Sequence, residues 1–146
     1  MNTRFEYMYR DSANWKNFGS VVFAGGLTPE IRVRFDSLFE PGDSFIAQQI
    51  GIPEVFLWDP TVDYDRDDPP AGLMPGNYVI GDEDHCFHEF CGIEEVSDDE
   101  TPTDPRTIAQ FVEDVAIAKK AGWAVFAPTD RCSEELRERL LASGIC

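Results

Sequence analysis

The chain has 146 residues, a formal net charge of −16 and an isoelectric point near 4.2. The length suits one domain with a buried core, and a hydrophobic fraction of 42% argues against a disordered chain. The charge argues against direct binding to nucleic acid or to anionic membranes, because phosphate groups repel an acidic surface. The chain lacks the roughly 20 apolar residues of a membrane span and the apolar run of a signal peptide. We therefore expect a soluble, cytoplasmic protein.

The first third of the sequence predicts a hairpin followed by a helix. An alternating aromatic pattern over residues 4–10 predicts a strand with one buried face. A second strand is predicted over 20–24, and a hairpin with a long connection most simply joins the two. A helix is predicted over 28–39, because Thr28 can cap its free backbone N–H groups and Pro29 suits its first position.

The middle of the chain has shorter periodic patterns. Residues 45–50 fit either a short strand or a helical turn, and residues 55–58 predict a brief strand. The Asp, Pro and Gly content of residues 59–76 predicts an acidic surface loop. Strands are predicted on either side of the next turn, over 77–80 and 85–93.

The last third predicts two helices with a strand between them. The clearest helix covers residues 104–121, a strand is predicted over 123–126, and a last helix over 133–143. Residues 1–146 are therefore expected to form a single globular α+β domain. In this domain about three helices would pack on a mostly antiparallel sheet.

Nearly all of the net charge lies in residues 54–104. This segment has 16 Asp or Glu residues and one basic residue, Arg66, whereas the flanks 1–53 and 105–146 have net charges of −1 and 0. Solubility alone does not require such asymmetry, and carboxylates beside aromatic side chains are typical of surfaces that bind basic proteins. The candidate partner-binding residues are Trp58, Asp59, Asp63, Tyr64, Asp65, Asp67, Asp68, Asp82, Glu83 and Asp84.

This pattern favours a non-enzymatic acidic protein that binds a basic protein surface. An inhibitor, an immunity protein or a nucleic-acid mimic would be the most specific form, since carboxylates can imitate a row of phosphates. No cofactor is expected. The open alternative is that the charge only keeps the protein in solution.

A metal- or histidine-dependent enzyme centred on His85, His88 and Glu89 is the alternative function. A strand over 85–93 would point the two histidines to opposite faces. It would also separate His85 from Glu89 by about 13 Å, so local metal chelation is not expected.

The acidic loop also contains half of a calcium motif. Asp63, Asp65 and Asp67 have the spacing of the first three ligands of an EF-hand loop. Asp68 stands where that loop needs glycine, and Met74 where it needs glutamate. Weak calcium binding is therefore the most that the spacing predicts.

Two short segments carry a resemblance to other proteins. Phe5-Glu6-Tyr7-Met8-Tyr9-Arg10-Asp11 and Asp84-His85-Cys86-Phe87-His88-Glu89-Phe90 resemble segments of small bacterial proteins of unassigned function. The resemblance implies a bacterial or phage cytosolic origin and assigns no activity, cofactor or site residue.

Overall fold

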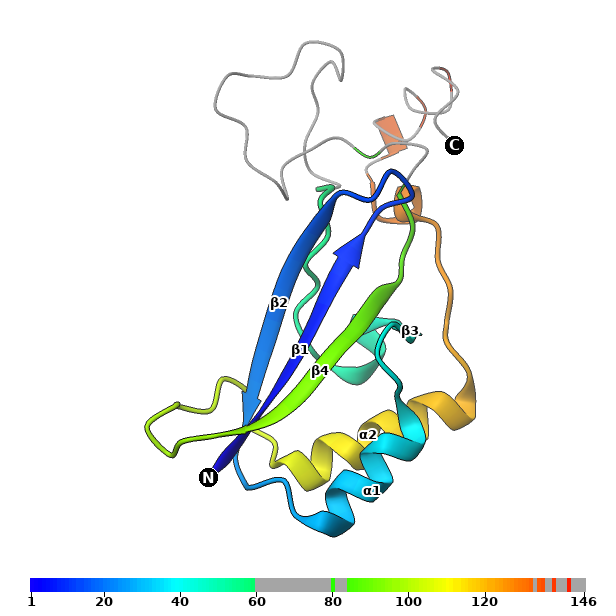
Figure 1. Cartoon of the computed structure of the whole chain (residues 1–146). Coiled ribbons are helices and arrows are strands. Elements are labelled where there is room, and N and C mark those ends of the chain that lie inside the picture. The colour runs from blue at the N-terminus through cyan, green and yellow to red at the C-terminus, as the bar shows by residue number, and fades with distance from the viewer. Residues whose placement is uncertain (60–79, 81–83, 133, 136–137, 139–141, 143–146) are drawn as a thin grey trace.

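The structure is a computed structural model that describes residues 1–59, 80, 84–132, 134, 135, 138 and 142. Its centre is a four-stranded antiparallel sheet with the strand order β2-β1-β4-β3, packed by two α-helices (Figure 1). The architecture is therefore α+β, as predicted. The elements in chain order are β1 (Asn2–Arg10), β2 (Lys16–Phe23), α1 (Pro29–Leu38), β3 (Ser44–Phe45), the 3-10 helix η1 (Ala47–Ile50), β4 (His88–Val96), α2 (Ile108–Ala121) and the 3-10 helix η2 (Pro128–Arg131).

Strand β1 lies between β2 and β4 and supplies the aromatic side of the sheet. Phe5, Tyr7 and Tyr9 are all buried, which confirms the face predicted from their alternation. The Phe5 ring has the most aromatic neighbours and contacts rings from β1, α1, β3, β4 and α2. One alternating strand thus joins the sheet to both helices.

The β1–β2 hairpin is confirmed, but its connection is shorter than predicted. Strand β2 begins at Lys16, four residues before the predicted start, and residues 11–15 form the turn. The Asp11 N–H donates to the Trp15 carbonyl at 3.0 Å, and Asn14 adopts a left-handed conformation with φ of 72°. Asparagine tolerates this conformation better than most residues, which lets the chain reverse tightly here.

Both helices pack on the same face of the sheet. Helix α1 begins where predicted, with the Thr28 hydroxyl accepting from the Ile31 N–H, and it buries Phe35. Helix α2 starts later than predicted, because Thr107 and Gln110 form its capping box while residues 104–106 stay outside the helix. The largest core cluster comprises Phe5, Tyr7, Val21, Phe23, Phe35, Phe39, Phe45, Ala47, Ile50, Ile52, Phe90, Ile108, Phe111, Val112, Val115 and Ala118.

A second, smaller core lies at the other end of β1. It contains Tyr9, Phe56, Leu57, Trp58 and Ile80. The strands predicted over 55–58 and 123–126 are wrong, because both segments are chain without a strand, apart from a single β-bridge residue at Trp58, and side-chain packing holds them. The apolar runs there reflect burial, which a short run cannot distinguish from strand pairing.

Three further predictions have mixed outcomes. Residues 45–50, which fit either a short strand or a helical turn, contain both, since β3 ends at Phe45 and η1 begins at Ala47. The strand predicted over 77–80 lies outside the described residues apart from Ile80. The helix predicted over 133–143 also lies mostly outside them, so the expected number of about three helices stays a prediction.

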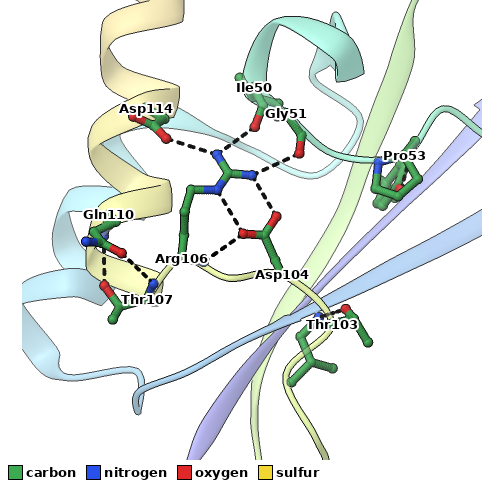
Figure 2. Close-up of polar contacts among 11 residues, drawn as sticks. Ile50, Gly51, Pro53, Thr103, Asp104, Arg106, Thr107, Gln110 and Asp114 are labelled. Carbon is green, nitrogen blue, oxygen red and sulfur yellow. Dashed lines mark hydrogen bonds and ion pairs between the residues drawn. The ribbon is translucent and has the colours of Figure 1, made fainter.

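Arg106 connects the start of α2 to η1 (Figure 2). Its guanidinium forms two parallel bonds with Asp104, at 3.0 and 2.8 Å, and a third with Asp114 at 3.0 Å. Its remaining donors reach the carbonyls of Ile50 at 2.8 Å and Gly51 at 3.0 Å. All five guanidinium N–H groups are thus used in a fork geometry that lysine lacks.

The charge of Asp104 is part of this arrangement. The Arg106 guanidinium holds the pKa of the Asp104 carboxyl below its usual value of 3.8. A depressed carboxyl pKa stabilises the fold above the unfolded pKa, and the stabilisation is lost as the pH falls through the folded pKa. The connection from η1 to α2 should therefore weaken only in acid.

We predict that Arg106→Lys lowers the free energy of unfolding by about 2 kcal/mol at neutral pH, because Asp104 and the carbonyls of Ile50 and Gly51 lose donors. The difference in the free energy of unfolding between wild type and this variant should shrink below about pH 4, where Asp104 becomes protonated in the unfolded chain. Urea denaturation at several pH values measures both effects. Arg32→Lys is the matched control, since Arg32 forms an exposed pair with Asp36 and should change stability by less than about 0.5 kcal/mol. Equal losses in the two variants would contradict the role given to Arg106.

Candidate functional site

The predicted partner-binding residues fall into two groups. Trp58, Asp59 and Asp84 are described, whereas Asp63, Tyr64, Asp65, Asp67, Asp68, Asp82 and Glu83 lie outside the described residues. The possible calcium ligands Asp63, Asp65 and Asp67 belong to the second group. The structure therefore gives the positions of three of the ten candidate partner-binding residues.

Trp58 is not an exposed anchor, contrary to its predicted role. Its side chain is 3% exposed and its ring stacks on Phe56 with centroids 4.2 Å apart. It belongs to the smaller core, together with Tyr9 and Ile80. A tryptophan beside acidic residues in the sequence indicated a binding surface, but its neighbours in space are apolar.

Asp84 is engaged in an internal hydrogen bond. It accepts from the Tyr9 hydroxyl at 2.6 Å, and that hydroxyl in turn accepts from the His85 N–H at 3.2 Å. Burial and the neighbouring Asp84 carboxylate raise the pKa of Tyr9. The group is thus a structural link between β1 and the chain that leads into β4.

His85 and His88 lie near each other, but not in the predicted arrangement. Strand β4 starts at His88, so His85 precedes it, and the prediction that the two occupy opposite faces of one strand is wrong. Both rings contact the Tyr9 ring, with centroid separations of 5.1 Å for His85 and 5.8 Å for His88. The strand began three residues later than its aromatic pattern indicated because residues 85–87 turn to close over Tyr9.

Both imidazoles bond to the main chain. His85 Nδ1 accepts from the Phe87 N–H at 3.0 Å, so its Nε2 carries the hydrogen and donates to the Arg10 carbonyl at 2.6 Å. His88 Nε2 accepts from the Val55 N–H at 2.9 Å. These contacts hold the irregular chain against the sheet, and they occupy both nitrogens of His85 and Nε2 of His88.

Glu89 is directed away from the histidines. Its carboxylate accepts from Arg10 Nε at 2.9 Å on the other face of the sheet. Among the described residues, no group of three His, Cys, Asp or Glu side chains is placed to hold a metal ion. The three residues of the alternative enzyme centre therefore do not converge on one point.

His88 has an unusual electrostatic environment. Its side chain is fully buried among the rings of Tyr7, Phe45 and Phe56, and its Nδ1 has no hydrogen-bond partner among the described residues. Burial, with smaller contributions from His85 and Arg131, lowers its pKa from 6.5 to about 3. The imidazole is therefore neutral in the folded protein at ordinary pH.

The structure also places an acidic cluster that the residue-level prediction missed. The end of β4 and the loop after it carry Glu94, Glu95, Asp98, Asp99 and Glu100, all exposed, and we call these five residues the acidic tip. The acidic tip lies beside the N-terminus, at the opposite end of β4 from its first residue, His88 (Figure 1). These five residues are among the 16 acidic residues of segment 54–104, so the uneven distribution of charge in the sequence could have identified them.

Counter-charges for the acidic tip come from the N-terminal strand. Arg4 reaches Glu94 at 2.7 Å and Glu100 at 2.5 Å, and the terminal amino group pairs with Asp98. Among the described residues, two cations therefore pair with three of the five carboxylates, and the acidic tip keeps a net negative charge on the surface.

Comparisons with protein-family models, with curated proteins and with solved structures found no match for this chain. Within the described residues, no helix is both long enough and apolar enough to cross a bilayer.

We predict that the stability of the protein falls as the pH drops from 6.5 toward 3. In this window His88 binds a proton in the unfolded chain but not in the folded protein. The free energy of unfolding therefore falls by up to about 1.4 kcal/mol for each pH unit. His88→Gln should remove this part of the pH dependence, because the glutamine oxygen can accept from the Val55 N–H and does not titrate. Urea denaturation from pH 7 to pH 3 provides the measurement. His85→Gln is the control, because it leaves the buried imidazole in place and should retain the slope.

Proposed function

We propose that this protein is a non-enzymatic binding protein whose partner presents a basic surface. The observation that carries the proposal is the concentration of charge, with −15 of the net −16 located in residues 54–104. The acidic tip belongs to this segment and leaves five carboxylates exposed on one end of the molecule. A surface of one sign raises the encounter rate with a partner of the opposite sign.

The positions of the arginines also support this function. Four arginines of the near-neutral flanks pair with carboxylates of the acidic segment, namely Arg4, Arg10, Arg106 and Arg131. These four arginines therefore neutralise carboxylates within the protein. Among the described residues of the segment, Glu95 and Asp99 form no ion pair, and a basic partner would provide them with counter-ions.

An inhibitor, an immunity protein or a nucleic-acid mimic would each use such a surface. In all three, steering by charge brings the partner in, and aromatic or apolar contacts then hold it. The alternative of a histidine-dependent enzyme has less support, because both imidazoles bond to the main chain.

We predict that the protein captures basic proteins at low salt and releases them as salt is added, because exposed charges are screened beyond about 8 Å at physiological ionic strength. Asp98→Asn, Asp99→Asn and Glu100→Gln together should slow association several-fold with a smaller change in dissociation. A second variant with Asp63, Asp65, Asp67 and Asp68 changed to Asn tests the other part of the segment. Surface plasmon resonance on an immobilised basic protein gives both rate constants.

The control for charge loss alone is a variant that neutralises acidic residues outside the segment, Glu30→Gln and Asp36→Asn. It should retain most of the association rate, since these residues lie on α1. Wild-type protein that captures no basic protein even at low salt would refute the proposal and leave solubility as the role of the charge.

A further inference from the structure

In the part of the chain that the structure describes, the outer side of β2 is covered at only one of its ends. The Val22 N–H donates to Thr103 Oγ1 at 3.0 Å, and the Val22 carbonyl accepts from the Thr103 N–H at 2.9 Å. The Ala24 carbonyl accepts from the Ile108 N–H at 2.9 Å. The chain that leads into α2 therefore closes this edge of the sheet beside residues 22–24.

Within the described part of the chain, no segment covers residues 16–20 of β2 in this way. The β1–β2 register is continuous along its whole length, so backbone groups alternate between the β1 side and the outer side. Since the groups of Val22 point outward, those of Lys16, Phe18 and Ser20 do too. All three residues are exposed, and these outward groups make no backbone hydrogen bond within the described part of the chain.

The most exposed aromatic side chains among the described residues lie on this open edge and directly before it. Trp15 is 73% exposed and Phe18 is 68% exposed. Proteins usually protect a free edge with proline, a bulge or several charged residues, and residues 16–20 have one such feature, Lys16. An open edge with apolar side chains is the arrangement that binds an added strand.

A hollow lies next to this edge on the sheet face opposite the helices. It is lined by Glu6, Tyr7, Phe18, Gly19, Ser20 and Cys91. The register of β4 against β1 shifts at this point, and Glu6 pairs with Gly92, which has no side chain. The small Ser20 and the missing side chain at residue 92 leave the Glu6 carboxylate reachable from the β2 edge.

Glu6 lacks a close counter-ion among the described residues. Its carboxylate is 4.0 Å from Arg4, whose guanidinium lies closer to Glu94 and Glu100. A strand added beside β2 would lie about 10 Å from β1, which is two strand spacings. A lysine or arginine on that strand, opposite Ser20, is long enough to reach the Glu6 carboxylate.

We propose that residues 16–20 of β2 bind an extended basic segment of the partner protein as a fifth strand. A lysine or arginine of that segment pairs with Glu6, and an apolar residue two positions away packs on Phe18. This inference rests on the proposed function for the basic character of the partner. Charge decides against a second copy of the chain as the occupant, because two chains of net charge −16 repel each other.

The probe is a capped, fluorescent peptide, Lys-Thr-Val-Thr-Lys-Thr-Val, which places lysine and valine on one face and threonine on the other. The control peptide is N-methylated at its lysines and valines, so that it keeps the charge and loses the donors for strand pairing. Fluorescence anisotropy with wild-type protein should show binding of the first peptide and at least about tenfold weaker binding of the second. Amide exchange should slow at Phe18 and Ser20 when the first peptide binds.

Two protein variants locate the site. Ser20→Pro removes an outward N–H that the folded sheet does not use, and it should weaken binding about tenfold. Ser20→Thr is the matched control, because it keeps the N–H, and it should bind nearly as well as wild type. Glu6→Gln should weaken binding several-fold and reduce its salt dependence, because the ion pair is lost. Circular dichroism confirms that each variant is folded.

Three results would overturn the strand-addition proposal. The first is equal binding of the parent and N-methylated peptides, or no binding of the parent peptide. The second is unchanged binding by a folded Ser20→Pro variant. The third is a wild-type dimer that Ser20→Pro converts to a monomer, since a second copy would then occupy the edge.

Polylysine separates this proposal from the proposed function. Wild-type protein that binds polylysine at low salt but not the peptide retains the acidic binding function and lacks the strand site. Wild-type protein that binds neither would refute both.

Discussion

The fold depends on the alternation of side chains along β1. Phe5, Tyr7 and Tyr9 point to one face of the central strand, and all three are fully or almost fully buried. Phe5 and Tyr7 lie in the main core beneath the helices, whereas Tyr9 lies in the smaller core with Phe56 and Trp58. A shift of one residue along this strand would expose the aromatic rings and bury Arg4 and Glu6. The register of β1 therefore determines both cores at once.

The same alternation gives the opposite face its polar and partly open character. Its side chains on β1 are Arg4, Glu6, Met8 and Arg10, and none of the described helices covers them (Figure 1). An antiparallel sheet can expose one face to water at little cost, because its side chains there are already polar. The face and its β2 edge are thus available for contacts with other molecules, while the aromatic face is occupied.

Charge in this protein has both internal and external roles. Arg106 joins Asp104 and Asp114 to the carbonyls of η1, and Arg131 pairs with Glu54 while it stacks on Phe126. These partly buried pairs connect segments far apart in the chain. The acidic tip, by contrast, pairs with two cations among the described residues, Arg4 and the terminal amino group. The proposed binding function draws on this second class of charge, which the fold does not neutralise.

The histidines illustrate how a chemically suggestive motif can have a structural role. His85 and His88 both contact Tyr9, yet each nitrogen with an assigned partner bonds to main-chain groups. Among the described residues, no third metal-ligating side chain joins these two histidines. The buried, neutral imidazole of His88 instead accepts a hydrogen bond from the Val55 N–H. It thereby holds a segment of irregular chain that has no strand partner to bond with.

The sequence by itself determined the elements that depend on local periodicity. The buried face of β1, the Thr28-capped helix α1 and the core stripe of α2 each follow from spacing within a few residues. The uneven distribution of charge also follows from the sequence alone. These features require no knowledge of which distant residues meet, because they reflect the repeat of a helix or a strand.

Only the tertiary structure decided the features that depend on contacts between distant segments. The irregular but buried course of residues 55–58, the later start of α2 and the burial of Trp58 all result from packing across the chain. The open edge at residues 16–20 likewise depends on where the chain before α2 crosses β2. A short apolar run is buried equally well by a strand or by irregular chain, so its partners, and not its composition, select between them.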